Sequence, residues 1–258
     1  MENPPVRVKR TPKAITLVLD RGSEGNTINS ALIEGIERAL DDAEADPGIR
    51  LVVLEGQPGV FCTGMDFRSA ASSEATNPEE LERAVRRYFQ LLKRFTRSGK
   101  VVVAKVDGKV NAGGLGLVAA TDFVIATERS TFALSEALFG LLPATVVPFL
   151  MRRIGFQKAY VMTLTAQAND ARAAVEMGLV DEVADHLDEA IRKLLVRVDR
   201  VREKTIRAAK EYFERMWFFT REMENEAVRW SVELIRDPET FQSIREFIQE
   251  GVLPWANR

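Results

Sequence analysis

The amino-acid sequence predicts an α/β fold, and two features of its pattern carry that prediction. Through the first half of the chain, apolar runs of strand length alternate with stretches of helical periodicity, an order typical of α/β folds. From Pro143 onward the pattern is mostly helical. We therefore expect a core domain over residues 1–195 and a helical C-terminal region over residues 196–258. The 258 residues are enough for a sizeable hydrophobic core.

The first half of the chain opens with a predicted hairpin and then repeats strand and helix. Residues 6–8 and 14–19 form the hairpin. Apolar residues at helical spacing predict a helix over residues 28–45, which Asp46-Pro47-Gly48 ends. Residues 69–77 are small and polar and are predicted to form a mobile loop. The other expected elements are strands over residues 51–54, 60–62, 101–106 and 123–126, and helices over residues 78–96 and 113–120.

The second half is predicted to be a succession of helices. A helix over residues 171–177 ends at Gly178, a residue suited to a C-cap. Long amphipathic helices are expected over residues 187–201 and 205–235. Asp237-Pro238 then breaks the chain, and a last helix spans residues 240–250.

Composition and charge argue against several classes of function. The formal net charge of −2 gives no sign of a nucleic-acid-binding protein. No apolar run approaches the roughly 18 residues of a membrane span, and no apolar secretory signal is visible. Cys62 is the only cysteine and His186 the only histidine, which excludes an internal disulfide and a histidine-rich metal site. We expect a cytoplasmic protein without a metal.

Two glycine-containing turns are candidates for the reaction site. Gly64 lies in VFCTGMDF (residues 60–67) after an expected strand, and GKVNAGGLG (residues 108–116) joins a strand to a helix. Glycine lets the backbone approach a ligand closely, and N–H groups at a helix N-terminus lie in a favourable dipole. Two such turns facing each other would hold an oxyanion. The alternative interpretation is that these are packing glycines.

The string GLGLVA (residues 114–119) also fits a dinucleotide-binding pattern, with Glu136 about 20 residues further on. The match is weak, because it lies in mid-chain after a long loop that carries further glycines. A nucleotide-dependent oxidoreductase is therefore a distant alternative.

Four segments resemble the crotonase (enoyl-CoA hydratase/isomerase) family, in the same order and spacing and over nearly the whole chain. The resemblance implies a crotonase-like spiral of strand–strand–helix turns with a helical C-terminal trimerisation region, assembled as a homotrimer or hexamer. It also implies chemistry on an acyl thioester without any cofactor. The segments are FCTGMD at residues 61–66, residues 106–122, FALSE at residues 132–136 with Gly140 and Pro143, and ARAAVEMGLV at residues 171–180.

By position, the resemblance implies that the backbone N–H groups of Met65 and Gly113 are the oxyanion-hole donors. Gly64, Asp66 and Gly114 beside them are expected to contact the substrate. Removing a proton next to a thioester carbonyl puts negative charge on its oxygen. Two preorganised N–H donors stabilise that charge more in the transition state than in the ground state.

One position departs from the pattern of the family's hydratases, which carry two catalytic glutamates. The second maps to Glu136, whereas the first maps to Gly116, which cannot act as an acid or base. A single carboxylate can still take an α-proton and return a proton to a leaving hydroxyl, if an apolar surround moves its pKa toward neutrality. Glu136 is therefore expected to be catalytic. The alternative is a surface carboxylate at the start of a helix.

Several segments, among them LSEALFGL (residues 134–141), are similar to the dehydratases of polyketide β-methyl-branching cassettes. That similarity implies loss of water from a 3-hydroxy-3-methylglutaryl group, linked to acyl carrier protein or coenzyme A, to give 3-methylglutaconyl. Asn111 is then a catalytic candidate that binds the substrate hydroxyl or its free carboxylate, or else a turn residue. The rival hypotheses are an enoyl isomerase or decarboxylase using one glutamate, and a catalytically silent scaffold.

The free carboxylate of such a substrate calls for a cation, and Lys109, Arg68 and Arg87 are the candidates. Cys62 has no histidine near it in sequence, so we expect a buried structural thiol rather than a nucleophile. The aromatic residues within 212–219 are expected in the core, at a subunit interface or over the acyl pocket. The basic residues of the helix over 78–96 form either a docking face for an acidic carrier protein or a solvated face.

Overall fold

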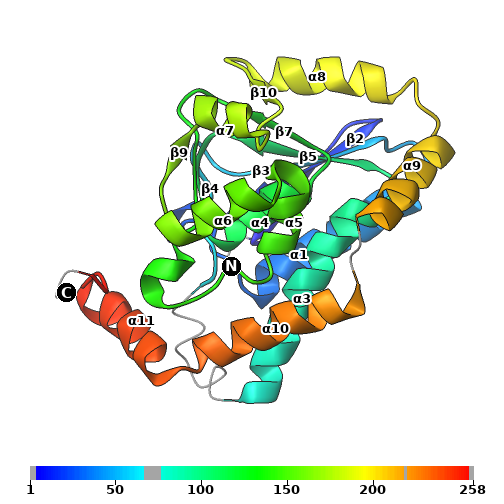
Figure 1. Ribbon diagram of the computed structural model, residues 1–258. Helices are drawn as coiled ribbons and strands as arrows, with labels where there is room; N and C mark the ends of the chain where they lie inside the picture. Colours follow the sequence, from blue (N-terminus) through cyan, green and yellow to red (C-terminus); the bar gives the residue numbers. More distant parts are fainter. Residues whose placement is uncertain (1–3, 67–76, 218–219, 256–258) are drawn as a thin grey trace.

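The computed structural model describes residues 4–66, 77–217 and 220–255, and two β-sheets lie at its centre (Figure 1). In the six-stranded sheet the hairpin of β1 and β2 is antiparallel and the other neighbours are parallel. The strands, in spatial order, are β1 (Val6–Arg10), β2 (Ala14–Leu19), β3 (Leu51–Glu55), β5 (Val101–Val106), β7 (Phe123–Ala126) and β10 (Glu182–Val183). The four-stranded sheet has the order β4 (Gly59–Cys62), β6 (Gly108–Asn111), β8 (Thr131–Ala133) and β9 (Asn169–Asp170).

Helices surround the sheets, and the C-terminal ones extend along the outside (Figure 1). The chain also forms the short 3₁₀ turns η1 (Gly22–Glu24) and η3 (Glu136–Phe139). The first helices are α1 (Ser30–Ala45), α3 (Pro78–Arg97), α4 (Gly113–Ala120), α5 (Val147–Ile154) and α6 (Phe156–Thr165). They are followed by α7 (Ala171–Met177), α8 (Leu187–Val198), α9 (Glu203–Met216), α10 (Arg221–Ile235) and α11 (Pro238–Glu250).

The chain winds as a spiral in which each turn adds one strand to each sheet. β3, β4 and α3 form one turn, and β5, β6 and α4 form the next. β7 and β8 then add a further strand to each sheet before α5. This arrangement confirms the expected spiral of strand–strand–helix turns within an α/β fold.

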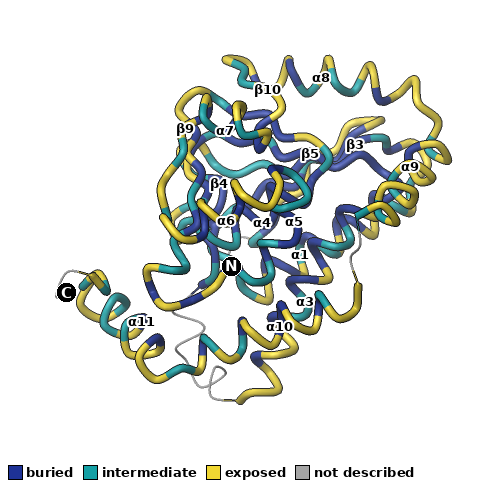
Figure 2. Tube along the Cα trace, in the orientation of Figure 1, coloured by how far each residue is buried: buried dark blue, intermediate teal, exposed yellow. Residues whose placement is uncertain are grey.

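The central strands β3 and β5 of the six-stranded sheet are covered on both faces, which explains their nearly continuous apolar sequences. Val52 and Val102 face the main core, shared with α1, α3, α4 and α5. Val53 and Val103 face the opposite way, toward a smaller cluster that includes residues of α8 and Ile206 of α9. Figure 2 shows the central strands β3 and β5 as buried and the outer helices as exposed along their solvent side.

Two features differ from the prediction. β6 and β8 were not expected as strands, because each is short and β6 lies within the glycine-rich stretch that was interpreted as a turn. The single helix expected over residues 205–235 is divided into α9 and α10. The second of these begins with its own N-cap, where the Thr220 side chain accepts a hydrogen bond from the Met223 backbone N–H.

The last helices pack back onto the core. α10 crosses and packs against α3 (Figure 1), where the buried Glu224 binds Gln90 and Lys93. α11 contacts η3, and Phe247 meets Phe139 edge to face at a ring-centroid distance of 5.2 Å. The C-terminal helices therefore complete an apolar cluster that also includes Met65. In the described part of the chain, no helix is long and apolar enough to cross a membrane.

Candidate active site

The candidate site lies where three parallel strands of the smaller sheet end. β4, β6 and β8 are neighbours in that sheet and run parallel, so their carboxyl ends share one edge. Gly64 and Met65 follow β4, Gly113 follows β6, and Glu136 follows β8. The fold thus brings together three of the segments in which the sequence predicted functional groups.

The segment after β4 contains a glycine whose backbone has a positive φ. Gly64 has a φ of +99°, and its carbonyl accepts a hydrogen bond from the Ile28 backbone N–H at 2.7 Å. The Asp66 N–H donates in turn to the Ile28 carbonyl at 3.0 Å. Between these two bonds, the Met65 N–H donates to no backbone carbonyl of a described residue. Among the described residues, this N–H is therefore left without a backbone acceptor.

The segment after β6 presents its own donor at the start of α4. Gly113 is the first residue of that helix, so its N–H has no acceptor within the helix and lies at the positive end of the helix dipole. Ala112 before it adopts φ 50° and ψ −130°, a conformation that is strained for a residue with a Cβ. This strained residue turns the chain from the strand into the helix at the position of the donor.

The two donor segments touch. A Cβ added to Gly64 would lie 2.6 Å from the Ala112 Cβ and 3.2 Å from the Gly113 nitrogen. Only glycine fits at position 64, both because of its φ and because of this contact. Two N–H groups without internal acceptors therefore lie on adjoining segments, the arrangement that an oxyanion hole requires.

Glu136 begins η3 and carries a carboxyl group in an unusual state. The residue is partly exposed as a whole, yet its Oε2 atom is buried and has no hydrogen-bond partner among the described residues. Burial raises the pKa of Glu136 from 4.5 to about 7, opposed only by a backbone hydrogen bond from its own N–H. A carboxyl group near neutrality can both accept and deliver a proton.

Asn111, the last residue of β6, is hydrogen-bonded to the residue that precedes Glu136. Its Nδ2 donates to the Ser135 hydroxyl at 2.8 Å. Its Oδ1 is buried and has no partner among the described residues. Buried polar atoms are normally paired, so the unpartnered oxygens of Asn111 and Glu136 indicate a place for a donor supplied by a ligand.

The raised pKa of Glu136 should also make the free energy of unfolding depend on pH. Because its pKa is raised in the native state, the stability present below about pH 4.5 is lost as the pH rises through about 7. Glu136→Gln removes this ionisation, so we expect the variant to be more stable than wild type by on the order of 2 kcal/mol above pH 7. Urea unfolding at pH 4 and pH 8 measures the difference. The same difference at both values would contradict the raised pKa.

The other predicted contact residues occupy varied positions. Asp66 is nearly buried and forms an ion pair with Arg21 at 3.0 Å. Gly114 packs against the Cys62 carbonyl, which would lie 2.3 Å from an added Cβ. Lys109 is an exposed residue of β6.

Of the other cations considered for the substrate, Arg87 is held by Glu37 at 2.6 Å. Arg68 lies outside the described residues, as does most of the loop expected over 69–77. Lys109 makes no ion pair with any residue that the structure describes.

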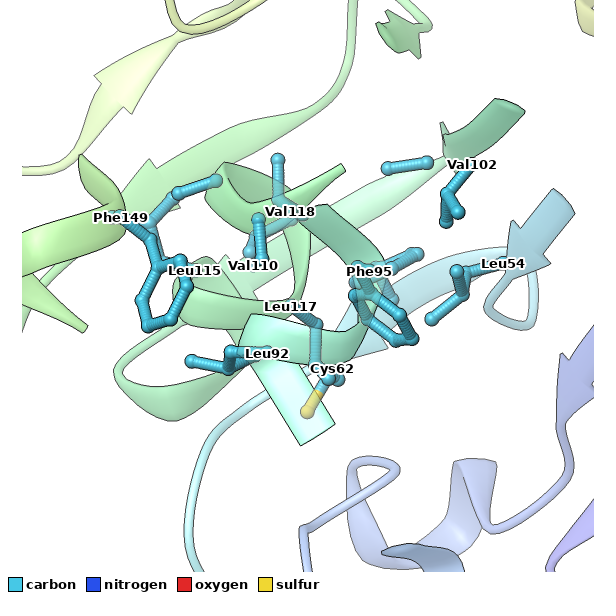
Figure 3. Packing of buried hydrophobic residues seen from close by; sticks show 14 of the residues in the cluster. Leu54, Cys62, Leu92, Phe95, Val102, Val110, Leu115, Leu117, Val118 and Phe149 are labelled. Carbon is cyan, nitrogen blue, oxygen red and sulfur yellow. The ribbon is translucent and has the colours of Figure 1, made fainter. Parts of the chain in front are cut away.

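Cys62 is a core residue, as expected. It belongs to the same buried cluster as Leu92 and Leu117 (Figure 3), and burial raises the pKa of its thiol to about 12. The tight fit of Gly114 and Gly116 inside the core also leaves no room for a pyrophosphate at the dinucleotide-like pattern. Both glycines are fully covered packing positions.

The remaining surface hypotheses have mixed outcomes. The core interpretation of the aromatic stretch is wrong for Tyr212 and Phe213, which are 61% and 69% exposed in the single chain. Phe218 and Phe219 lie outside the described residues.

The basic residues of α3 are neutralised by acidic residues of this same chain, which leaves little positive charge for a carrier protein. The pairs include Arg86–Glu82, Arg87–Glu37, Lys93–Glu224, Arg94–Glu44 and Arg97–Glu214.

Sequence reasoning missed two residues that shape the donor segments. The Arg21 guanidinium donates to the Thr27 carbonyl at 2.8 Å and to Asp66, which fixes the loop that runs beside Met65. The Tyr88 hydroxyl donates to the Gly113 carbonyl. Neither residue lies in a recognisable motif, and both act through contacts between segments far apart in sequence.

Known proteins resemble this chain over nearly its whole length. The model of the enoyl-CoA hydratase/isomerase family matches residues 10–256. The bacillaene synthase dehydratase PksH of Bacillus subtilis is 34% identical over 259 residues, covering 98% of this chain and 97% of its own.

Solved structures agree with that comparison. A crystal structure of the polyketide biosynthesis enoyl-CoA hydratase PksH from Bacillus subtilis matches with a TM-score of 0.88 at 34% identity, covering 96% of this chain and 98% of its own. An enoyl-CoA hydratase from Mycobacterium avium matches with a TM-score of 0.82 at 30% identity, covering 98% of this chain and 100% of its own.

Proposed function

This chain belongs to the enoyl-CoA hydratase/isomerase family, and from that premise we propose that it is a dehydratase of a 3-hydroxyacyl thioester. The observation that carries the proposal is the buried carboxyl oxygen of Glu136, which has no partner among the described residues and belongs to a group with a pKa of about 7. By the family resemblance, the first of the two hydratase glutamates maps to Gly116, so Glu136 would act alone. Similarity to a dehydratase of bacillaene synthase supports the same direction of reaction.

The proposed reaction uses Glu136 twice. The substrate thioester oxygen accepts hydrogen bonds from the Met65 and Gly113 N–H groups, and the Glu136 carboxylate takes the α-proton. The resulting enolate re-forms the carbonyl as the bond to the 3-hydroxyl breaks. Glu136 gives its proton to that leaving oxygen, so one water and one α,β-unsaturated thioester are formed. A single acid–base residue is sufficient because it ends each turnover as the carboxylate with which it began.

Asn111 is assigned to the leaving group. Its Oδ1 is the unpartnered acceptor, because its Nδ2 already binds Ser135. An acceptor oxygen suits the hydroxyl of the substrate, which can donate, and it repels a carboxylate. We therefore assign Asn111 to the 3-hydroxyl group and not to the distal carboxylate.

The substrate that we propose is 3-hydroxy-3-methylglutaryl linked to an acyl carrier protein, with 3-methylglutaconyl as product. Its free carboxylate needs a cation at the edge of the site. Lys109 is two residues before Asn111, and alternation along a strand puts both on the same face of β6. Its exposed ammonium group, without an ion-pair partner among the described residues, makes it our candidate for that role.

We also propose that the chain assembles as a homotrimer or hexamer. Support comes from large apolar side chains exposed on the single chain, including Phe156 and Leu164 on α6 and Phe213 on α9. Light scattering coupled to size exclusion measures the assembly, and a monomer at micromolar concentration would contradict this proposal.

Intact-mass spectrometry of the carrier-bound substrate tests the proposed function. The purified protein is mixed with 3-hydroxy-3-methylglutaryl on an acyl carrier protein, and the same group on coenzyme A is run in parallel. Loss of the mass of one water is the expected result. Loss of the mass of carbon dioxide alone indicates a decarboxylase. An unchanged mass with both carriers rejects the dehydratase.

A further inference from the structure

Tyr88 places its hydroxyl group at the first turn of α4. The residue belongs to α3 and is buried, with 8% of its surface exposed. Its oxygen donates to the Gly113 carbonyl. In an ideal α-helix that begins at this residue, the same carbonyl accepts the first i+4 backbone hydrogen bond. One tyrosine from another helix therefore binds the first carbonyl of α4.

The same hydroxyl occupies the space of a side chain at position 116. A Cβ added to Gly116 would lie 2.4 Å from the Tyr88 oxygen, a distance that no relaxed contact allows. The next nearest atoms are the Val146 Cγ2 at 3.0 Å and the Leu92 Cδ1 at 3.1 Å. The Tyr88 hydroxyl group therefore fits in this place because Gly116 has no side chain. Tyr88 and Gly116 form a complementary pair in this sense.

The position of this pair matters for the oxyanion donor. The Gly113 N–H follows Ala112, whose backbone is strained, so the orientation of the donor peptide has to be held by surrounding contacts. Tyr88 holds the carbonyl on the other side of the same glycine. A phenylalanine would fill nearly the same volume, so the hydroxyl is the group that distinguishes a positioning role from packing.

We infer that Tyr88 is a positioning residue, which orients the Gly113 N–H through its carbonyl and with Gly116 keeps a second acidic side chain out of the site. The inference rests on the proposed use of Gly113 as an oxyanion donor. It requires the Tyr88–Gly116 pair to act as one unit, so changes on either side should have the same consequence.

The experiment compares Tyr88→Phe, Gly116→Ala and the double variant with wild type. Tyr160→Phe, which removes the hydroxyl group of a half-exposed tyrosine on α6, is the matched control. Donor function is read from the near-ultraviolet absorbance of the enolate formed when an acetoacetyl thioester is bound at saturation. Affinity for this ligand is measured separately, and water loss gives kcat and KM. Circular dichroism verifies folding.

Tyr88→Phe is expected to lower kcat and the bound enolate fraction about tenfold, in the range seen when a group that orients an active residue is removed, with KM changed little. Gly116→Ala should produce a similar loss in wild type. In the Tyr88→Phe background it should cost much less, because the oxygen that it meets is gone. Tyr160→Phe should match wild type.

Tyr88→Phe with wild-type enolate absorbance and kcat would overturn the inference, as would fully additive effects in the double variant. Enolate formation by wild type without water loss would reject the dehydratase, while the enolate readout still tests Tyr88. Absence of enolate in wild type would remove the oxyanion role of Gly113 and the inference with it. If Tyr88→Phe does not fold, Gly116→Ala tests the pair from the other side.

Discussion

Glu136→Gln is expected to lower kcat for water loss about 10³-fold, within the usual contribution of a general acid–base group, with KM changed little. Glutamine keeps the size and polarity of the side chain but cannot take the α-proton. The substrate should still bind, because the donor N–H groups of Met65 and Gly113 are untouched. Single-turnover mass spectrometry separates the rate of water loss from binding.

The control for this variant is Glu128→Gln, which neutralises an exposed carboxylate near the start of β8 whose only described ion pair is to Arg172. It should retain wild-type kinetics. For wild type, kcat/KM should rise with pH up to about 7 and then level, because the carboxylate form of Glu136 begins the reaction. A Glu136→Gln rate within tenfold of wild type would remove this residue from the chemistry.

Gly64→Ala is expected to lower kcat about 10²-fold to 10³-fold, the loss typical of a missing oxyanion donor. The new methyl group would lie 2.6 Å from the Ala112 Cβ and 3.2 Å from the Gly113 nitrogen, so both donor segments have to move apart. A misplaced donor stabilises the enolate poorly even when the substrate binds. The enolate absorbance of a bound acetoacetyl thioester measures this loss directly.

Gly59→Ala offers a close control for that substitution. Gly59 lies at the start of β4 with a φ of +89°, and an added Cβ would have no atom within 4 Å. Both variants carry the backbone strain of about 1–2 kcal/mol that a left-handed alanine imposes, but only Gly64→Ala disturbs the donors. Equal losses of kcat in the two variants would show that strain, and not the contact, causes the effect.

The sequence predicted the elements whose periodicity is strong and local. The strands over Val101–Val106 and Phe123–Ala126 and the helix Gly113–Ala120 have the expected bounds. β6 and β8 were not predicted because they are short, and their apolar residues pair only with strands distant in sequence. The break between α9 and α10 was not predicted because helical periodicity continues on both sides of it. A single capping threonine marks the start of the second helix.

The candidate site was predictable to the extent that its residues lie in recognisable segments. Met65, Gly113 and Glu136 were named from the family resemblance, and the fold brings their segments to one edge of the smaller sheet. A pKa near neutrality was the condition set for a catalytic Glu136, and burial raises the pKa of this carboxyl group to about 7. Tyr88 had no local signal, because its role depends on a contact between α3 and α4 that only the tertiary structure supplies.

The spiral has a consequence for how such a protein can change during evolution. The proposed donors after β4 and β6 and the proposed acid–base residue after β8 occupy equivalent places in successive turns. Each place lies just beyond a strand, so a substitution there alters one chemical role while the pairing of the strands is kept. On the proposed roles, a lineage could therefore exchange or lose the carboxylate at one turn and keep the two turns that carry the N–H donors.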